Sequence, residues 1–125
     1  MEISIYRAAL LVALGGGAGS ALRFLVWVWM RPSGGFPWAT LAVNLAGCFL
    51  IGIIYGLSSR HASEQMRLLL ATGFCGGFTT FSAFGAENLQ LVQQGQFGLA
   101  SAYAASSIAG GITAVWLGNL VLSKW

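Results

Sequence analysis

Charged residues are scarce in this chain. Only 7% of its 125 residues are Asp, Glu, Lys or Arg, whereas 57% are apolar. A soluble domain of this size needs a largely polar surface, and this composition cannot provide one. The composition therefore excludes a soluble globular domain and predicts an integral membrane protein.

Other shortages exclude further classes of protein. The net charge of +3 is small and its positive residues are scattered along the chain, which argues against a nucleic-acid partner. The only two cysteines, Cys48 and Cys75, lie in apolar segments without the spacing of metal ligands, and we interpret them as apolar filler. No nucleophile–base pair or metal-ligand cluster is visible, so an enzyme is not expected.

Four apolar stretches are long enough to cross a membrane, which takes about 20 residues. They cover residues 8–30, 36–57, 68–86 and 97–122. The first could be read as a secretory signal, but the apolar run resumes after Arg23 and three more stretches follow. The prediction is an all-α membrane protein of four transmembrane helices, with residues 1–125 forming one domain.

The distribution of Lys and Arg favours a cytoplasmic location for both termini. Four such residues fall on the side of the N-terminus, one falls on the opposite side, and one falls within a span: Arg7, Arg60, Arg67 and Lys124; Arg31; and Arg23. Positive residues are enriched on the cytoplasmic side of membrane proteins. The bias is small, so the sequence specifies the orientation only weakly.

The third stretch is interrupted at mid-span by Gly76-Gly77-Phe78-Thr79-Thr80-Phe81-Ser82-Ala83-Phe84. Gly76 and Gly77 can adopt backbone angles closed to other residues, which would free carbonyl groups near residues 76–80. A broken helix is tolerated at membrane depth only where protein or a water-filled path surrounds it. Transporters bind ions and substrates at such breaks, so this segment is the predicted functional site.

Neutral hydrogen-bond donors recur in the other spans. Thr40 and Asn44 share a helical face, as do Tyr103 and Ser107, because each pair is four residues apart. Asn44 is either a polar contact between helices or a donor that lines a pore. With Thr80 and Ser82 from the break, these residues form a row of neutral donors, which suits a small anion. The only acid near this row is Glu87, which we expect at the mouth of the path.

Phe81 and Phe84 follow the break three residues apart. The edge of an aromatic ring is positive, so two edges on one side of a helix could face an anion path. Ordinary aromatic packing is the alternative, and the spacing alone favours that packing.

Three segments together resemble the Fluc (CrcB) fluoride channels. They are Gly15-Gly16-Gly17-Ala18-Gly19-Ser20-Ala21-Leu22-Arg23-Phe24, then Thr40-Leu41-Ala42-Val43-Asn44-Leu45-Ala46-Gly47, and then residues 73–84 followed by Glu87. The resemblance covers all four spans in order, and the third segment is the most specific.

The resemblance implies a passive, fluoride-selective channel that exports fluoride and so confers fluoride resistance. It implies an antiparallel homodimer of dual topology with two pores, embedded in lipid as a multi-pass protein of the cell inner membrane. A structural sodium ion would lie at the centre of the dimer, held by the backbone carbonyls of Gly76 and Thr79. Unwound backbone carbonyls suit such a hard cation.

The predicted pore set combines the residues that match the family with those of the polar row. The asparagine and phenylalanines of the family's pore correspond to Asn44, Phe81 and Phe84. Arg23 is expected to add positive potential near a pore mouth, or else to pair with a carbonyl or with Glu87. The full set is Asn44, Phe81, Phe84, Ser82, Thr80, Thr40, Tyr103, Ser107, Glu87 and Arg23.

Two positions depart from the family pattern. Ala83 and Gly85 stand where many members carry hydroxyl residues, so a polar pore contact could be lost. Two other functions compete with the channel. A small multidrug-type exporter would need an acid in its first helix, which here carries Arg23 instead. A non-transporting assembly subunit would leave the broken helix and the polar row without a purpose.

Overall fold

The structure, a computed structural model, describes residues 3–31, 34–58 and 62–123. All secondary structure in these ranges is helical, and four helices within them are long and apolar enough to cross a membrane. The predicted all-α, four-span fold is confirmed. Arg60 and Lys124, which contribute to the charge bias, lie outside the described residues.

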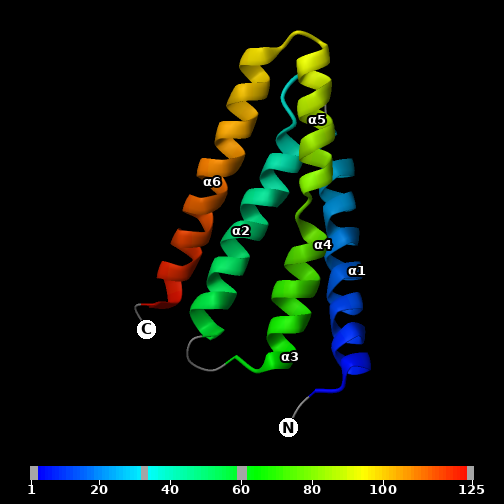
Figure 1. Cartoon of the computed structure of the whole chain (residues 1–125), viewed down its shortest axis with the longest axis vertical. Helices are drawn as coiled ribbons and strands as arrows, with labels where there is room; N and C mark the ends of the chain where they lie inside the picture. Colours follow the sequence, from blue (N-terminus) through cyan, green and yellow to red (C-terminus); the bar gives the residue numbers. More distant parts are fainter. Residues whose placement is uncertain (1–2, 32–33, 59–61, 124–125) are drawn as a thin grey trace.

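Three of the spans are single helices. They are α1 (Ile5–Met30), α2 (Trp38–Ser58) and α6 (Phe97–Ser123). Pro37 directly precedes α2, where its missing N–H group costs no helical hydrogen bond. Figure 1 shows that the start of α1 and the end of α6 lie at the same end of the molecule.

The third span is composite. It consists of α3 (Glu64–Met66), the π-helix η1 (Arg67–Cys75), α4 (Gly76–Phe78) and, after an extended step, α5 (Phe81–Gln93). The interruption consists of Thr79, with ψ of 156°, and Thr80, with ψ of 117°. The break therefore lies within the predicted range of residues 76–80.

The expected reason for the break was wrong. Gly76 is helical, with φ of −62° and ψ of −38°, and Gly77 lies in the same short helix. The glycine at position 77 serves close packing, because a Cβ there would clash with the backbone of Gly16 on α1. The extended backbone instead belongs to the two threonines.

Glycines also set the distance between the other packed helices. A Cβ on Gly15 or Gly19 would lie against backbone atoms of η1 and α4, and a Cβ on Gly52 or Gly118 would do the same between α2 and α6. Small residues allow such close approach where lipid removes the hydrophobic drive for association. α1 therefore packs along the first half of the third span, and α2 packs along α6.

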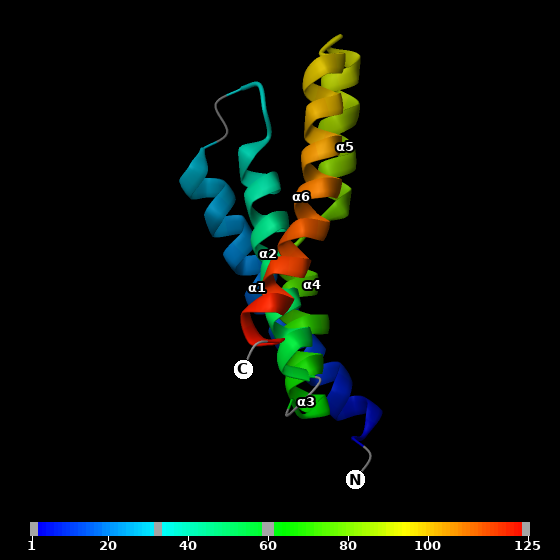
Figure 2. The same cartoon turned by 90° about the vertical axis from the view of Figure 1, so that its left-hand side faces the viewer.

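Beyond the break the molecule divides into two arms. Figure 2 shows the end of α1 and the start of α2 on one side, with α5 and the start of α6 on the other. An apolar cluster of Leu41, Leu91, Ala100 and the fully buried Tyr103 joins α2, α5 and α6. Large apolar side chains are exposed over most of the outer surface, as expected of a multi-pass membrane protein.

Candidate functional site

The break is held open by Asn44. Its side-chain Nδ2 donates to the Thr80 carbonyl at 3.1 Å, and its Oδ1 accepts from the Thr80 backbone N–H at 2.7 Å. One amide thus satisfies both peptide groups of an extended residue. Since unpaired backbone groups are costly in lipid, this pair explains how α2 stabilises an interruption in the third span.

Hydroxyl groups close the two helix ends at the break. Thr80 begins α5 as its N-cap, because its Oγ1 accepts from the backbone N–H of Ala83 at 3.2 Å. Thr79 ends α4, and its Oγ1 donates back to the Cys75 carbonyl at 2.8 Å. Ser82 lies within 3.2 Å of the Thr80 hydroxyl and is otherwise exposed.

The break redirects backbone donors away from two carbonyl groups. In a continuous helix the Thr80 N–H would donate to Gly76 O and the Ala83 N–H to Thr79 O. These N–H groups instead donate to Asn44 and to the Thr80 hydroxyl. Gly76 and Thr79 also line a cavity of about 300 Å³ whose wall contains no charged residue. Neutral carbonyl oxygens in such a setting fit a hard monovalent cation.

Arg23 binds a carbonyl at the break. Its Nε donates to Gly77 O at 3.0 Å, and the Ser20 hydroxyl donates to the same oxygen at 3.4 Å. Of the partners expected for Arg23, the structure thus has the carbonyl rather than Glu87. Arg23 also lines a cavity of about 260 Å³ together with Thr80 and Glu87, so a positively charged residue borders this space.

Glu87 joins the two hydroxyls that the sequence places on other helices. Thr40 donates to its Oε1 and Tyr103 donates to its Oε2, each at 2.6 Å. A carboxylate accepts hydrogen bonds at both oxygens, and this arrangement fills one position on each. Thr40 and Tyr103 therefore direct their protons to Glu87 in this structure, and Glu87 itself is half-buried.

The two phenylalanines are adjacent but differ in exposure. Their ring centroids are 5.5 Å apart, and Phe84 also packs 5.0 Å from the ring of Tyr103. Phe81 is 83% exposed, whereas Phe84 is half-buried beside the apolar cluster. The packing role that the spacing favoured applies to Phe84, while Phe81 projects away from its own chain.

Ser107 keeps an unused hydroxyl. Its Oγ is buried and has no hydrogen-bond partner within the described part of the chain. Buried polar atoms are normally paired, so such an atom is a candidate contact for a water molecule, an ion or another chain. It lies one helical turn from Tyr103, on the face that the spacing predicts.

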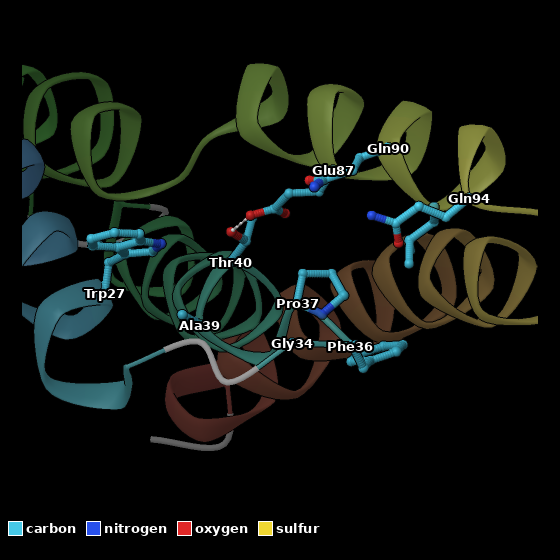
Figure 3. A pocket seen from close by; sticks show the side chains of 11 residues that line it. Trp27, Gly34, Phe36, Pro37, Ala39, Thr40, Glu87, Gln90 and Gln94 are labelled. Atoms are coloured by element: carbon cyan, nitrogen blue, oxygen red, sulfur yellow. Dashed lines mark hydrogen bonds between the residues drawn. The ribbon is translucent and has the colours of Figure 1, made fainter. Parts of the chain in front are cut away.

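Two cavities adjoin this site on the side of Arg23. The cavity of about 260 Å³ and another of about 400 Å³ have four lining residues in common: Trp27, Ala39, Thr40 and Glu87. Figure 3 shows the larger cavity, with Thr40 and Glu87 hydrogen-bonded to each other at its edge. The shared residues indicate one continuous hollow that leads to the break.

The structure thus gathers most of the predicted residues into two groups. Asn44, Thr80 and Ser82 meet at the break. Thr40 from α2, Glu87 from α5 and Tyr103 from α6 form a second cluster. Sequence reasoning missed Trp27, Gln90 and Gln94, which line the larger cavity. The spacing of Glu87, Gln90 and Gln94 at three and four residues was the available signal.

Comparison with known proteins is consistent with this geometry. The family described as "CrcB-like protein, Camphor Resistance (CrcB)" matches residues 10–119. The chain belongs to the CrcB family. This match covers all four spans and the whole of the site.

Curated relatives carry a functional name. The chain is 50% identical over 123 residues to the "Fluoride-specific ion channel FluC" of Chlorobium phaeobacteroides strain BS1, covering 96% of both chains. Proteins of the same name from Phocaeicola vulgatus and Methylobacillus flagellatus are 47% and 51% identical, covering 90% and 87% of this chain and 95% and 89% of theirs. All three are named as ion channels rather than as enzymes, which confirms that expectation.

Proposed function

We propose that this chain forms a fluoride-selective channel that lets fluoride leave the cell passively. The observation that carries the proposal is the break stabilised by Asn44, because it interrupts the helical backbone of a membrane span beside a cavity that Arg23 lines. Fluoride is small and strongly hydrated, so compact donors must replace its lost water. The names of the CrcB-family relatives support this choice of anion.

The pore residues under this proposal are those that surround the break and the Glu87 cluster. Asn44, Thr80 and Ser82 supply polar groups at the break, and Ser107 adds a hydroxyl that has no partner among the described residues. Phe81 and Phe84 present rings next to them. Thr40 and Tyr103 act by holding Glu87, and Arg23 supplies the positive potential.

The proposed functional unit is an antiparallel homodimer with two pores in the cell inner membrane. Two observations support a second copy. Phe81 is 83% exposed although it belongs to the most specific motif, and Gly76 is exposed beside a cavity at the break. A ring and a polar backbone would both gain a protein environment from a partner, whereas lipid cannot satisfy the backbone.

The proposed sodium ion would bind the carbonyl oxygens of Gly76 and Thr79. Two oxygens from one chain are too few for a sodium ion, so two copies would be needed to provide four. Bound there, the ion would place a fixed positive charge at the centre of the dimer. The test is to follow the proportion of dimer by size-exclusion chromatography in sodium chloride and in N-methylglucamine chloride. Loss of dimer only without sodium supports this part, and an equal proportion in both contradicts it.

The test of the channel itself uses purified protein in liposomes loaded with potassium fluoride. Fluoride efflux is followed with an ion-selective electrode and started with valinomycin, which lets potassium compensate the charge. A channel gives efflux that depends on valinomycin. Efflux that needs a proton gradient instead, or no efflux above protein-free liposomes, would contradict the proposal.

A further inference from the structure

The cavity of about 400 Å³ contains more polar groups than the site described above uses. Its wall includes the indole of Trp27 and the side-chain amides of Gln90 and Gln94. Glu87 is the only charged residue among the described residues that line it, and each of its carboxylate oxygens already accepts a hydrogen bond from a hydroxyl group. The other polar side chains named here are neutral: the indole of Trp27 can donate one hydrogen bond, and each glutamine amide can both donate and accept.

One face of α5 carries this polarity. Glu87, Gln90 and Gln94 follow one another at helical spacing, so they form a single stripe that begins at the Thr40 contact and runs toward the end of the helix. Figure 3 shows these three residues along α5, opposite Thr40 and Pro37. Gln93, the last residue of α5, is exposed like Gln90 and Gln94, but it lines neither of the two adjoining cavities.

The position of this stripe suggests a role in binding an anion as it enters. An anion that approaches through this cavity of about 400 Å³ meets the negative charge of Glu87 before it reaches Arg23, because Arg23 lines only the adjoining cavity of about 260 Å³. Neutral amide donors between solvent and Glu87 can hold the anion without adding a fixed charge. Amide N–H groups that face a cavity can replace part of the water that a small anion loses when it enters.

We propose that Gln90 and Gln94 form an entry site for the permeating anion, in which their amide N–H groups bind a partly hydrated halide before it passes Glu87. This inference rests on the proposed channel function. It assigns to the two glutamines a specific role in the rate of entry, separate from the role of the residues at the break.

The experiment places the same charge at two neighbouring positions. Gln94→Glu adds a carboxylate to a residue that lines the cavity, and Gln93→Glu is the matched control at a residue that lines neither adjoining cavity. At fluoride concentrations well below saturation, we expect Gln94→Glu to lower the initial efflux at least about threefold and Gln93→Glu to leave it nearly unchanged. Gln94→Lys should raise it, which keeps the test valid if the acidic variant folds poorly.

Two further readouts separate entry from passage. Gln90→Met with Gln94→Met keeps the length of the side chains but removes their amides, so the half-saturating fluoride concentration should rise while the maximal flux stays the same. The defect of Gln94→Glu should shrink in about 1 M salt of an impermeant anion, because the screening length falls to about 3 Å.

The outcomes distinguish the entry site from the channel itself. Equal effects of the same charge at positions 93 and 94, or a fall in maximal flux without a change in half-saturation, would overturn the entry site while the channel stands. A wild-type protein without fluoride flux would instead refute the proposed function.

Discussion

Asn44 and Thr80 exchange two hydrogen bonds although 36 residues separate them in the sequence. This pair connects the first half of α2 to the only extended step in the described part of the third span. The amide of Asn44 supplies a donor for the C=O group of Thr80 and an acceptor for its N–H group. The same contact thus stabilises the fold and exposes polar groups at membrane depth.

Asn44→Ala should abolish transport and destabilise the protein. It leaves the N–H and C=O groups of Thr80 without this partner, at a cost of about 1–3 kcal/mol for each buried group that no other partner satisfies. Asn44→Asp keeps an acceptor for the Thr80 N–H but loses the donor to Thr80 O, and it adds a charge that repels an anion. Efflux assays and thermal unfolding in detergent measure the two effects.

The matched control for Asn44 is Asn88→Ala. Asn88 donates only to the Phe84 carbonyl of its own helix, at 3.3 Å, so its loss should leave efflux close to wild type. Transport loss of similar size in both variants would show that Asn44 has no specific role. Loss of the dimer before any loss of flux would favour a purely structural contact.

Phe81→Ile and Phe84→Ile should both lower fluoride flux steeply, because each keeps apolar bulk while it removes the positive ring edge. The structure predicts a difference in stability. Phe84 packs on Tyr103, so replacing it should lower the free energy of unfolding by about 0.5–1.5 kcal/mol. Replacing the exposed Phe81 should leave this free energy almost unchanged. Unfolding midpoints and efflux rates of both variants check this.

Phe97→Ile is the control, since Phe97 is also exposed but lies outside the motif. It should conduct like the wild type. Normal conduction by both Phe81→Ile and Phe84→Ile would reduce the two rings to packing residues.

Tyr103→Phe should lower the free energy of unfolding by about 1.5–3 kcal/mol, because Glu87 loses a hydrogen bond to a charged group. In a protein that already carries Glu87→Gln, Tyr103→Phe should lower the free energy of unfolding by less, because a neutral amide gains less from the hydroxyl than a carboxylate does. A double-mutant cycle measures this coupling. A coupling energy near zero would show that the contact does not stabilise the protein.

Gly77→Val should disrupt the fold by separating α1 from α4, because its side chain would meet the backbone of Gly16. Gly85→Ala is the control, because its added Cβ would meet no atom of another described segment within 4 Å. Inside an exposed helix this change should stabilise by about 0.5–1 kcal/mol. Expression level and unfolding midpoint distinguish the two, and normal assembly of Gly77→Val would contradict the packing described for this glycine.

Composition and the length of the apolar stretches were enough to predict the four spans, and the glycines and hydroxyl residues of the third stretch indicated the position of the break. Thr80 and Asn44 were assigned to one row of neutral donors, with the role of Asn44 left open. Local spacing could place Thr40 and Asn44 on one face, because helical geometry is fixed over four residues.

The pairing of side chains between helices could not be predicted in this way. That Tyr103 and Thr40 meet at Glu87, and that Arg23 binds Gly77 O, depends on how the helices are rotated against one another. The π-helix of η1 was also invisible, because a change in hydrogen-bond register leaves little trace in an apolar sequence. The cavity that Gln90 and Gln94 line was also invisible in the sequence, because it depends on how α5 lies against residues of other segments.

The most direct test of the proposed fluoride-selective channel compares fluoride with chloride in the same reconstituted protein. Liposomes loaded with potassium fluoride or potassium chloride are given valinomycin, and the efflux of each anion is recorded at matched protein density. We expect the reconstituted protein to give rapid fluoride efflux, and chloride efflux close to that of protein-free liposomes. Equal efflux of the two anions would contradict it.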